Sequence, residues 1–179
     1  MTHKLCLICS LMLLAVGSHA AEPGLGPVIK NYGPVFDVPA GAFNLKLDGH
    51  YKVTMDVSAA SKDNVSVNRN LESAARFLNM QARSGMPASS IEFALIVHGP
   101  AARDLLTDVA YDERFMVKNP NTELLSELKA AGVTVYLCGQ TAAYNDYLAD
   151  ELHPAVTMAL SAMTAHVRLQ AEGHTLIPF

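Results

Sequence analysis

The chain has 179 residues, of which 50% are hydrophobic and 17% are charged, and its formal net charge at pH 7 is −4. At roughly 150 residues per domain, this length predicts about one domain. The low charge and high apolar content exclude an intrinsically disordered chain. Because there is no basic excess to neutralise phosphates, we expect no nucleic-acid partner.

Residues 1–20 have the pattern of a secretory signal peptide. Lys4 precedes an apolar run, Leu5–Val16, and Ser18 and Ala20 then occupy the small-residue positions of a cleavage site. The run is shorter than the roughly 20 residues that span a bilayer, so we expect cleavage near Ala20 and no stable membrane insertion afterwards. The alternative is an uncleaved anchor. The pattern predicts a periplasmic or secreted protein.

Residues 21–50 are predicted to form an extended arm. This segment is dense in glycine and proline, which forbid a helix and disfavour a central strand. We expect the arm to lie on the domain or on a neighbouring chain, and a fragment such as Pro34–Val38 can form an edge strand. The remaining residues, 51–179, are predicted to form one α/β domain.

Three segments have the pattern of β-strands, with helical segments between them. Tyr51–Val57 alternates apolar and polar residues, Ile91–Val97 is almost wholly apolar, and residues 133–137 are rich in β-branched side chains. Apolar spacing, capping residues and glycine stops predict helices at 66–82, 121–129 with Asn121 as N-cap, and 141–149, with one or two helical turns at 101–108.

Pro154 predicts the start of another helix, which we expect to end near Gly173, before a last strand at 175–177. Two apolar stripes run along this helix: Val156, Ala159, Leu160, Met163 and Val167 form one, and Met158, Ala162, Ala165 and Leu169 form the other. A helix that is apolar on two sides needs more cover than one sheet supplies, so we expect a homo-oligomer. The alternative is that the arm covers the second stripe within one chain.

The alternation of strands and helices predicts a mostly parallel sheet with helices on both faces. In such sheets, ligands bind at the carboxyl ends of the strands. The residues expected at those ends are 58–61, 98–100 and 138–140.

Cys138 is the candidate reactive residue. It is the sole cysteine left once the signal segment, which holds Cys6 and Cys9, is removed. Gly139 permits a tight turn and the close approach of another group. If a helix begins directly after Gly139, its free N–H groups favour the thiolate, the form that attacks sulfur electrophiles. The alternative is a buried cysteine that acts as a small hydrophobic residue.

His98 ends the strand Ile91–Val97, and parallel strands bring it to the same edge as Cys138. An imidazole there can tune the thiol, or it can be structural. The other histidines match no zinc-ligand spacing with Cys138, and no nucleotide-binding or serine-hydrolase motif is present. We therefore expect neither a metal nor a cofactor.

Four segments in order resemble the DsrE/DsrF-like family, and more narrowly its exported branch: Val97–Ala101, Lys118–Asn121, Gly132–Gln140 and Leu169–Phe179. The resemblance runs from about Tyr32 to Phe179. It implies a single α/β domain with a mostly parallel five-stranded sheet, assembled as a homotrimer or homohexamer. In family members of sulfur-relay systems, a cysteine after the third main strand carries sulfur as a persulfide, and by position that cysteine is Cys138.

Two functions are compatible with these features. The first is binding or relay of sulfane sulfur through Cys138, as a sulfur carrier or sulfurtransferase with a sulfur donor or acceptor protein as partner. In it, His98 and Gln140 orient the sulfur, and Gly99 and Gly139 complete the binding site. The second is a non-catalytic oligomeric module whose strand-end pocket holds a small ligand.

Overall fold

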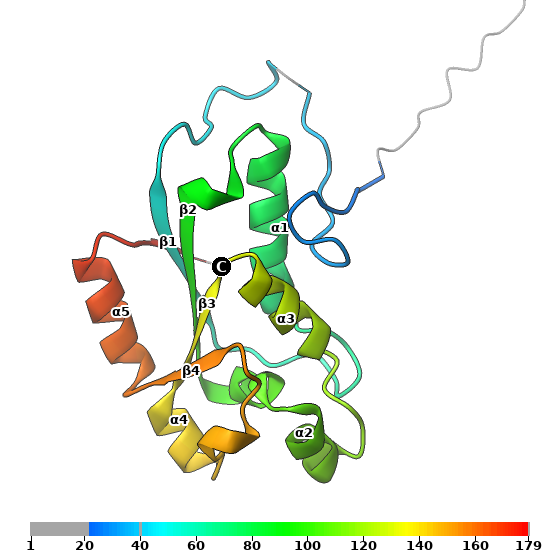
Figure 1. Cartoon of the computed structure of the whole chain (residues 1–179), viewed down its shortest axis with the longest axis vertical. Helices are drawn as coiled ribbons and strands as arrows, with labels where there is room; N and C mark the ends of the chain where they lie inside the picture. Colours follow the sequence, from blue (N-terminus) through cyan, green and yellow to red (C-terminus); the bar gives the residue numbers. More distant parts are fainter. Residues whose placement is uncertain (1–21, 40, 179) are drawn as a thin grey trace, which may run out of the picture.

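The computed structural model describes residues 22–39 and 41–178, so the predicted signal peptide lies outside the described residues (Figure 1). The elements follow in the order β1 (Tyr51–Val57), α1 (Arg69–Arg83), η1 (Ala88–Ser90), β2 (Ile91–Val97), η2 (Gly99–Leu105), α2 (Asp108–Phe115), α3 (Thr122–Ala130), β3 (Thr134–Cys138), α4 (Gly139–Tyr144), η3 (Ala149–Glu151), β4 (Val156–Ala159), α5 (Ala162–Ala171) and β5 (Thr175–Ile177). Here η marks a 3-10 helix. In the described part of the chain, no helix is both long and apolar enough to cross a membrane.

The five strands form one sheet in the order β4-β3-β2-β1-β5, and every neighbouring pair is parallel. The predicted α/β class is therefore confirmed. β2 lies at the centre and is buried except for Glu92, which is why its sequence is an almost unbroken apolar run. The outer strands β4 and β5 are short and more exposed, in keeping with their edge positions.

Helices cover the two faces of the sheet unequally. Buried leucines and alanines of α1 and α3 pack with η2 against one face, and α5 lies alone against the other (Figure 1). On the α5 face, Ala94 and Ile96 of β2 pack against Ala165 and Leu169. η2, α2 and α4 gather at the carboxyl edge of the sheet, where the strands end (Figure 1).

The single helix predicted from Pro154 to Gly173 is wrong. The chain first forms β4, which pairs with the last four residues of β3, and α5 begins only at Ala162. Ser161 sets this boundary, because its side chain accepts a hydrogen bond from the backbone N–H of Thr164 and caps the new helix. β4 gains its backbone hydrogen bonds from the sheet edge, a long-range interaction that apolar spacing along the chain does not reveal.

Smaller differences lie at the carboxyl edge of the sheet and in the arm. α2 was not predicted, and the predicted helix 141–149 begins earlier, at Gly139, and ends at Tyr144. Pro34–Val38 forms no strand; Val35 makes only an isolated antiparallel bridge to Gly24.

A buried polar network joins α1, η2 and the start of α3. Asn121 does not cap α3 with its side chain; its Oδ1 accepts from the N–H of Asn68, 2.7 Å away, and its amide donates to Asn119. Asn68 in turn caps α1 and donates to Asp104. Asp104 is fully buried, and this burial raises the pKa of its carboxyl group against the opposing effect of its donors.

The arm is docked on α1 through one buried side chain. The Asn79 side chain accepts hydrogen bonds from the N–H groups of Val28 and Ile29 and donates to the carbonyls of Ile29, Tyr32 and Gly33. Gly33 has φ +67°, and a Cβ there would lie 2.3 Å from the backbone nitrogen of Arg76. The backbone of the arm therefore rests directly on the helix backbone.

Replacing Asn79 with alanine is expected to lower the free energy of unfolding by about 2–4 kcal/mol, since several buried backbone groups of the arm lose their partner. The arm should then be cleaved faster by proteases in native buffer. Chemical denaturation and limited proteolysis measure the two effects. Asn70→Ala is the matched control on the same helix and is expected to change stability by less than about 0.5 kcal/mol. Equal effects of both substitutions would contradict the docking role of Asn79.

Candidate functional site

The carboxyl ends of β2 and β3 form the centre of the candidate site. Val97 pairs with Leu137, so the next residues, His98 and Cys138, follow at neighbouring strand ends. The edge between these two strands is the place where the sequence predicts the site.

Cys138 lies on the α5 face of the sheet and is 7% exposed. Burial raises the pKa of its thiol, but hydrogen bonds from the Thr141 hydroxyl and from the backbone N–H groups of Ala162, Thr141 and Gln140 outweigh this, so the pKa falls below its ordinary value. These donors come from the first turn of α4 and the first residue of α5. Cys138 is the only cysteine in the part of the chain that the structure describes, and it is free.

Gly139 makes this arrangement possible. A Cβ on Gly139 would lie 2.6 Å from the carbonyl oxygen of Ala159 and 3.1 Å from that of Leu160. Because glycine has none, the end of β4 can approach the start of α4, which brings Ala162 within reach of the sulfur. The close approach that the sequence suggests for Gly139 is therefore to the backbone of β4.

His98 does not bond to Cys138. Its Nε2 lies 3.0 Å from Oδ2 and 3.1 Å from Oδ1 of Asp56, at the end of β1. On the other side of this carboxylate, Nε2 of His166 on α5 lies 2.7 Å from Oδ1. The sequence did not indicate either partner of His98. Asp56 occupies an ordinary polar position in an alternating strand, and His166 is a single polar residue in a helix.

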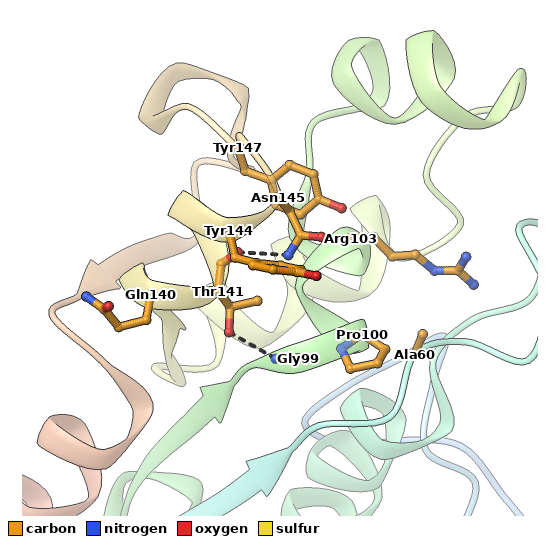
Figure 2. Close-up of a pocket in the computed structure, with 9 residues that line it drawn as sticks. All are labelled: Ala60, Gly99, Pro100, Arg103, Gln140, Thr141, Tyr144, Asn145 and Tyr147. Atoms are coloured by element: carbon orange, nitrogen blue, oxygen red, sulfur yellow. Dashed lines mark hydrogen bonds between the residues drawn. The ribbon is translucent and has the colours of Figure 1, made fainter.

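Gly99 and Gln140 line a hollow of about 610 Å³ beside Cys138. Figure 2 shows side chains from α4 and the turn after it on one side of the hollow and those of Pro100 and Ala60 on the other. The full lining is Ala60, Gly99, Pro100, Arg103, Gln140, Thr141, Tyr144, Asn145 and Tyr147. Cys138 is not part of this wall.

Thr141 connects the hollow to the cysteine. Its Oγ1 accepts a hydrogen bond from the N–H of Gly99 at 3.1 Å (Figure 2), and its hydroxyl is one of the donors that lower the pKa of Cys138. The sequence did not single out Thr141, although a hydroxyl residue in the first turn after a strand-end cysteine is a usable signal. Within the described residues, no group of three or more His, Cys, Asp and Glu side chains is arranged to hold a metal ion.

A second hollow, of about 750 Å³, lies between the arm, α1 and the strands β1 and β5. Its walls are mainly apolar side chains, and it contains none of the site residues that the sequence singled out.

A family model matches residues 52–179 and is described as the DsrE/DsrF-like family. The chain belongs to this family. The match begins in β1, covers the whole sheet and includes Cys138, and it leaves out the arm. No curated protein matches the chain.

Two solved structures share the fold of this DsrE/DsrF-like chain. A protein of unknown function, MTH1491 from Methanobacterium thermoautotrophicum, is 21% identical with a TM-score of 0.55, over 72% of this chain and 99% of that protein. The ychN protein from E. coli is 15% identical with a TM-score of 0.52, over 72% of this chain and 99% of its own.

The Thr141→Val variant is expected to raise the pH midpoint of Cys138 alkylation by iodoacetamide by about one unit, because a hydrogen bond to a charged group is worth roughly 1.5–3 kcal/mol and one pKa unit about 1.4 kcal/mol. Thr141→Ser keeps the hydroxyl and should restore the low midpoint. Thr134→Val, on the exposed side of β3, is the control. A wild-type midpoint at or above that of free cysteine would contradict the lowered pKa.

Proposed function

We propose that this chain is an exported sulfur-carrier protein that holds sulfane sulfur on Cys138 as a persulfide. The observation that carries the proposal is Cys138, the one free cysteine among the described residues, at the carboxyl end of β3 and with a pKa lowered by donors from two helix starts. Membership of the DsrE/DsrF-like family, which is associated with sulfur relay, supports it. The segment 1–20 supports export to the periplasm or beyond.

The chemistry needs a thiolate and a sulfane-sulfur donor. The Cys138 thiolate attacks the outer sulfur of a donor R–S–SH, so that a new S–S bond forms at Cys138 while the S–S bond of the donor breaks. The electron pair leaves with R–S⁻, which then takes up a proton. In this proposal Gln140, His98 and Gly99 lie around the path of the sulfur, and Gly139 lets the backbone donor of Ala162 reach the cysteine. The partner is a donor or acceptor of sulfane sulfur.

A non-catalytic ligand-binding module is the second candidate, and the 610 Å³ hollow favours it. Its wall offers two tyrosine rings, two side-chain amides and a guanidinium group, which suit a small ligand without a reactive thiol. In that case Cys138 is a buried residue that supports the wall through Thr141.

Intact-mass analysis after incubation with inorganic polysulfide or thiosulfate separates the two candidates. The wild type is expected to gain the mass of one sulfur atom per chain, and cyanide should remove it as thiocyanate. Cys138→Ser should fold as the wild type does and gain nothing. A correctly folded wild type that gains no sulfur would refute the sulfur-carrier proposal and favour the ligand-binding module.

We further propose that the chain forms a homotrimer or homohexamer. The sequence argument rested on a helix that the structure replaces with β4 and α5, but apolar side chains of this region remain exposed: Leu160 at 72%, Met163 at 77% and Val167 at 71%. Leu160 directly follows the open edge strand β4, and Met163 and Val167 lie one turn apart on α5. Exposed apolar side chains next to an open strand edge favour association.

Light scattering is expected to give the mass of three or six chains for the wild type. Met163→Glu combined with Val167→Glu should shift this mass toward the monomer, since it places two like charges in the interface. Val65→Glu changes a residue that is 68% exposed outside this surface and serves as the control. A wild-type protein that is monomeric at a concentration of tens of micromolar would contradict the oligomer.

A further inference from the structure

The carboxylate of Asp56 joins two imidazole rings on the α5 face of the sheet. His98 follows β2, Asp56 lies on β1 and His166 comes from α5, so three separate elements meet at one side chain. All three residues are only partly exposed: 34% for the side chains of Asp56 and His98 and 20% for that of His166. The side chain of His166 from the covering helix thus bonds to the same carboxylate as His98.

The hydrogen bonds to Asp56 determine which nitrogen of each imidazole ring carries the proton. Burial alone raises the pKa of Asp56, but hydrogen bonds from His166 and His98 and their charges outweigh it, so the pKa is lowered and the group is a carboxylate. A carboxylate only accepts hydrogen bonds, so each ring carries a proton on Nε2. The Nδ1 of His98 forms no hydrogen bond with any residue that the structure describes. This nitrogen is therefore free to exchange a proton.

The strand register places His98 beside Cys138. The backbone of His98 is extended, with φ −152° and ψ −180°, and continues β2 by one residue beyond Val97. Side chains two residues apart on a strand share a face, so His98 faces α5 as Ile96 does, and Ile96 packs in the same cluster as Cys138. Neighbouring strands are about 4.8 Å apart, so the backbones of His98 and Cys138 are adjacent, while the His98 ring turns toward Asp56 on β1, which lies on the other side of β2.

We propose that His98 is the acid–base residue for sulfur exchange at Cys138, and that Asp56, itself held by His166, is the positioning residue that orients the His98 ring. This inference rests on the proposed sulfur-carrier function. The arrangement is a nucleophile with a base that a third group orients, a combination that serves covalent exchange chemistry on unrelated folds.

The proton balance closes over one cycle of loading and release. During loading, protonated His98 gives its Nδ1 proton to the departing R–S⁻, so that R–SH leaves and His98 is neutral. During release, neutral His98 takes the proton of an acceptor thiol R′–SH. The resulting thiolate attacks the outer sulfur of Cys138–S–SH and breaks its S–S bond, and the Cys138 thiolate and protonated His98 are regenerated. Throughout, the Nε2–H group of His98 remains hydrogen-bonded to the carboxylate of Asp56.

Few other titratable side chains on this face of the sheet can make the rate of sulfur release depend on pH. On this face, the remaining titratable or charged side chains of β1, β2, β3, α5 and the turn after it are Lys52 paired with Glu92, Tyr136, Arg168 paired with Glu172, and His174, whose Nε2 lies 3.5 Å from Glu92. His174 Nδ1 lies 3.0 Å from the carbonyl oxygen of Leu169, at the far end of α5.

The test measures sulfur release at different pH values. Cys138 is loaded with inorganic polysulfide, desalted and mixed with free cysteine as the acceptor, and the loss of the sulfur adduct is followed by intact mass. His98→Gln is expected to slow release about 100-fold and to make its rate depend less on pH. Alkylation of the unloaded thiol should change less than about threefold, because its four donors remain. His50→Gln, an exposed histidine outside this face, is the control.

Asp56→Asn is expected to slow release at least about tenfold, because the amide has one acceptor oxygen in place of two and no negative charge, so the His98 ring loses its orientation. The double variant Asp56→Asn/His98→Gln should be no slower than His98→Gln alone, since the two groups act as one unit. Additive losses would indicate separate structural effects and overturn the inference.

Two further outcomes are decisive. If His98→Gln loads sulfur and releases it at the wild-type rate at every pH, the inference is wrong while the sulfur-carrier proposal stands. If even the wild type accepts no sulfur, the proposed function itself fails. ¹⁵N NMR of the histidines in the wild-type protein is a measurement that does not require any variant to fold. His98 and His166 should both be protonated on Nε2 when neutral, and the opposite tautomer at His98 would overturn the proposal.

Discussion

The parallel pairing of β1, β2 and β3 is the constraint on which the rest of the structure depends. It forces all strand ends to one edge, and it leaves two apolar faces that only helices can cover. Because side chains alternate along a strand, a slip of one residue between β2 and β3 would move Cys138 from the α5 face to the face of α1 and α3. The register Val97–Leu137 therefore decides which groups the cysteine meets.

Cys138 is buried, yet its surroundings favour the charged thiolate form. These two properties oppose each other, because burial normally disfavours a charge. Desolvation disfavours the charge, and four hydrogen-bond donors restore it. Two of these donors, the N–H groups of Gln140 and Ala162, are far apart in the sequence and meet because Gly139 lets the end of β4 approach the start of α4. The absence of a side chain at Gly139 thus allows the hydrogen bond that helps to lower the pKa of Cys138.

Asp56 and Asp104 show how the same side chain takes opposite properties in one small domain. Asp104 is fully buried, and burial dominates, so its pKa is raised and it belongs to the polar network that ties η2 to α1. Asp56 lies at the edge of the sheet between two imidazole donors, and its pKa is lowered. The first carboxyl group suits a structural role, and the second can orient a ring that exchanges protons.

Much of this protein follows from its sequence, because apolar runs, glycine and proline act locally: the bounds of β1 and β2, the place of Cys138 and His98 at strand ends, and the α/β class were all predictable. The helix predicted from Pro154 failed, since β4 depends on pairing with β3 rather than on its own apolar spacing. The sequence placed His98 at the same edge as Cys138 with either a tuning or a structural role, but it did not reveal that the ring bonds Asp56, which with His166 lies far away in the chain. Long-range contacts of this kind depend on sheet register and helix packing, so only the tertiary structure decided them.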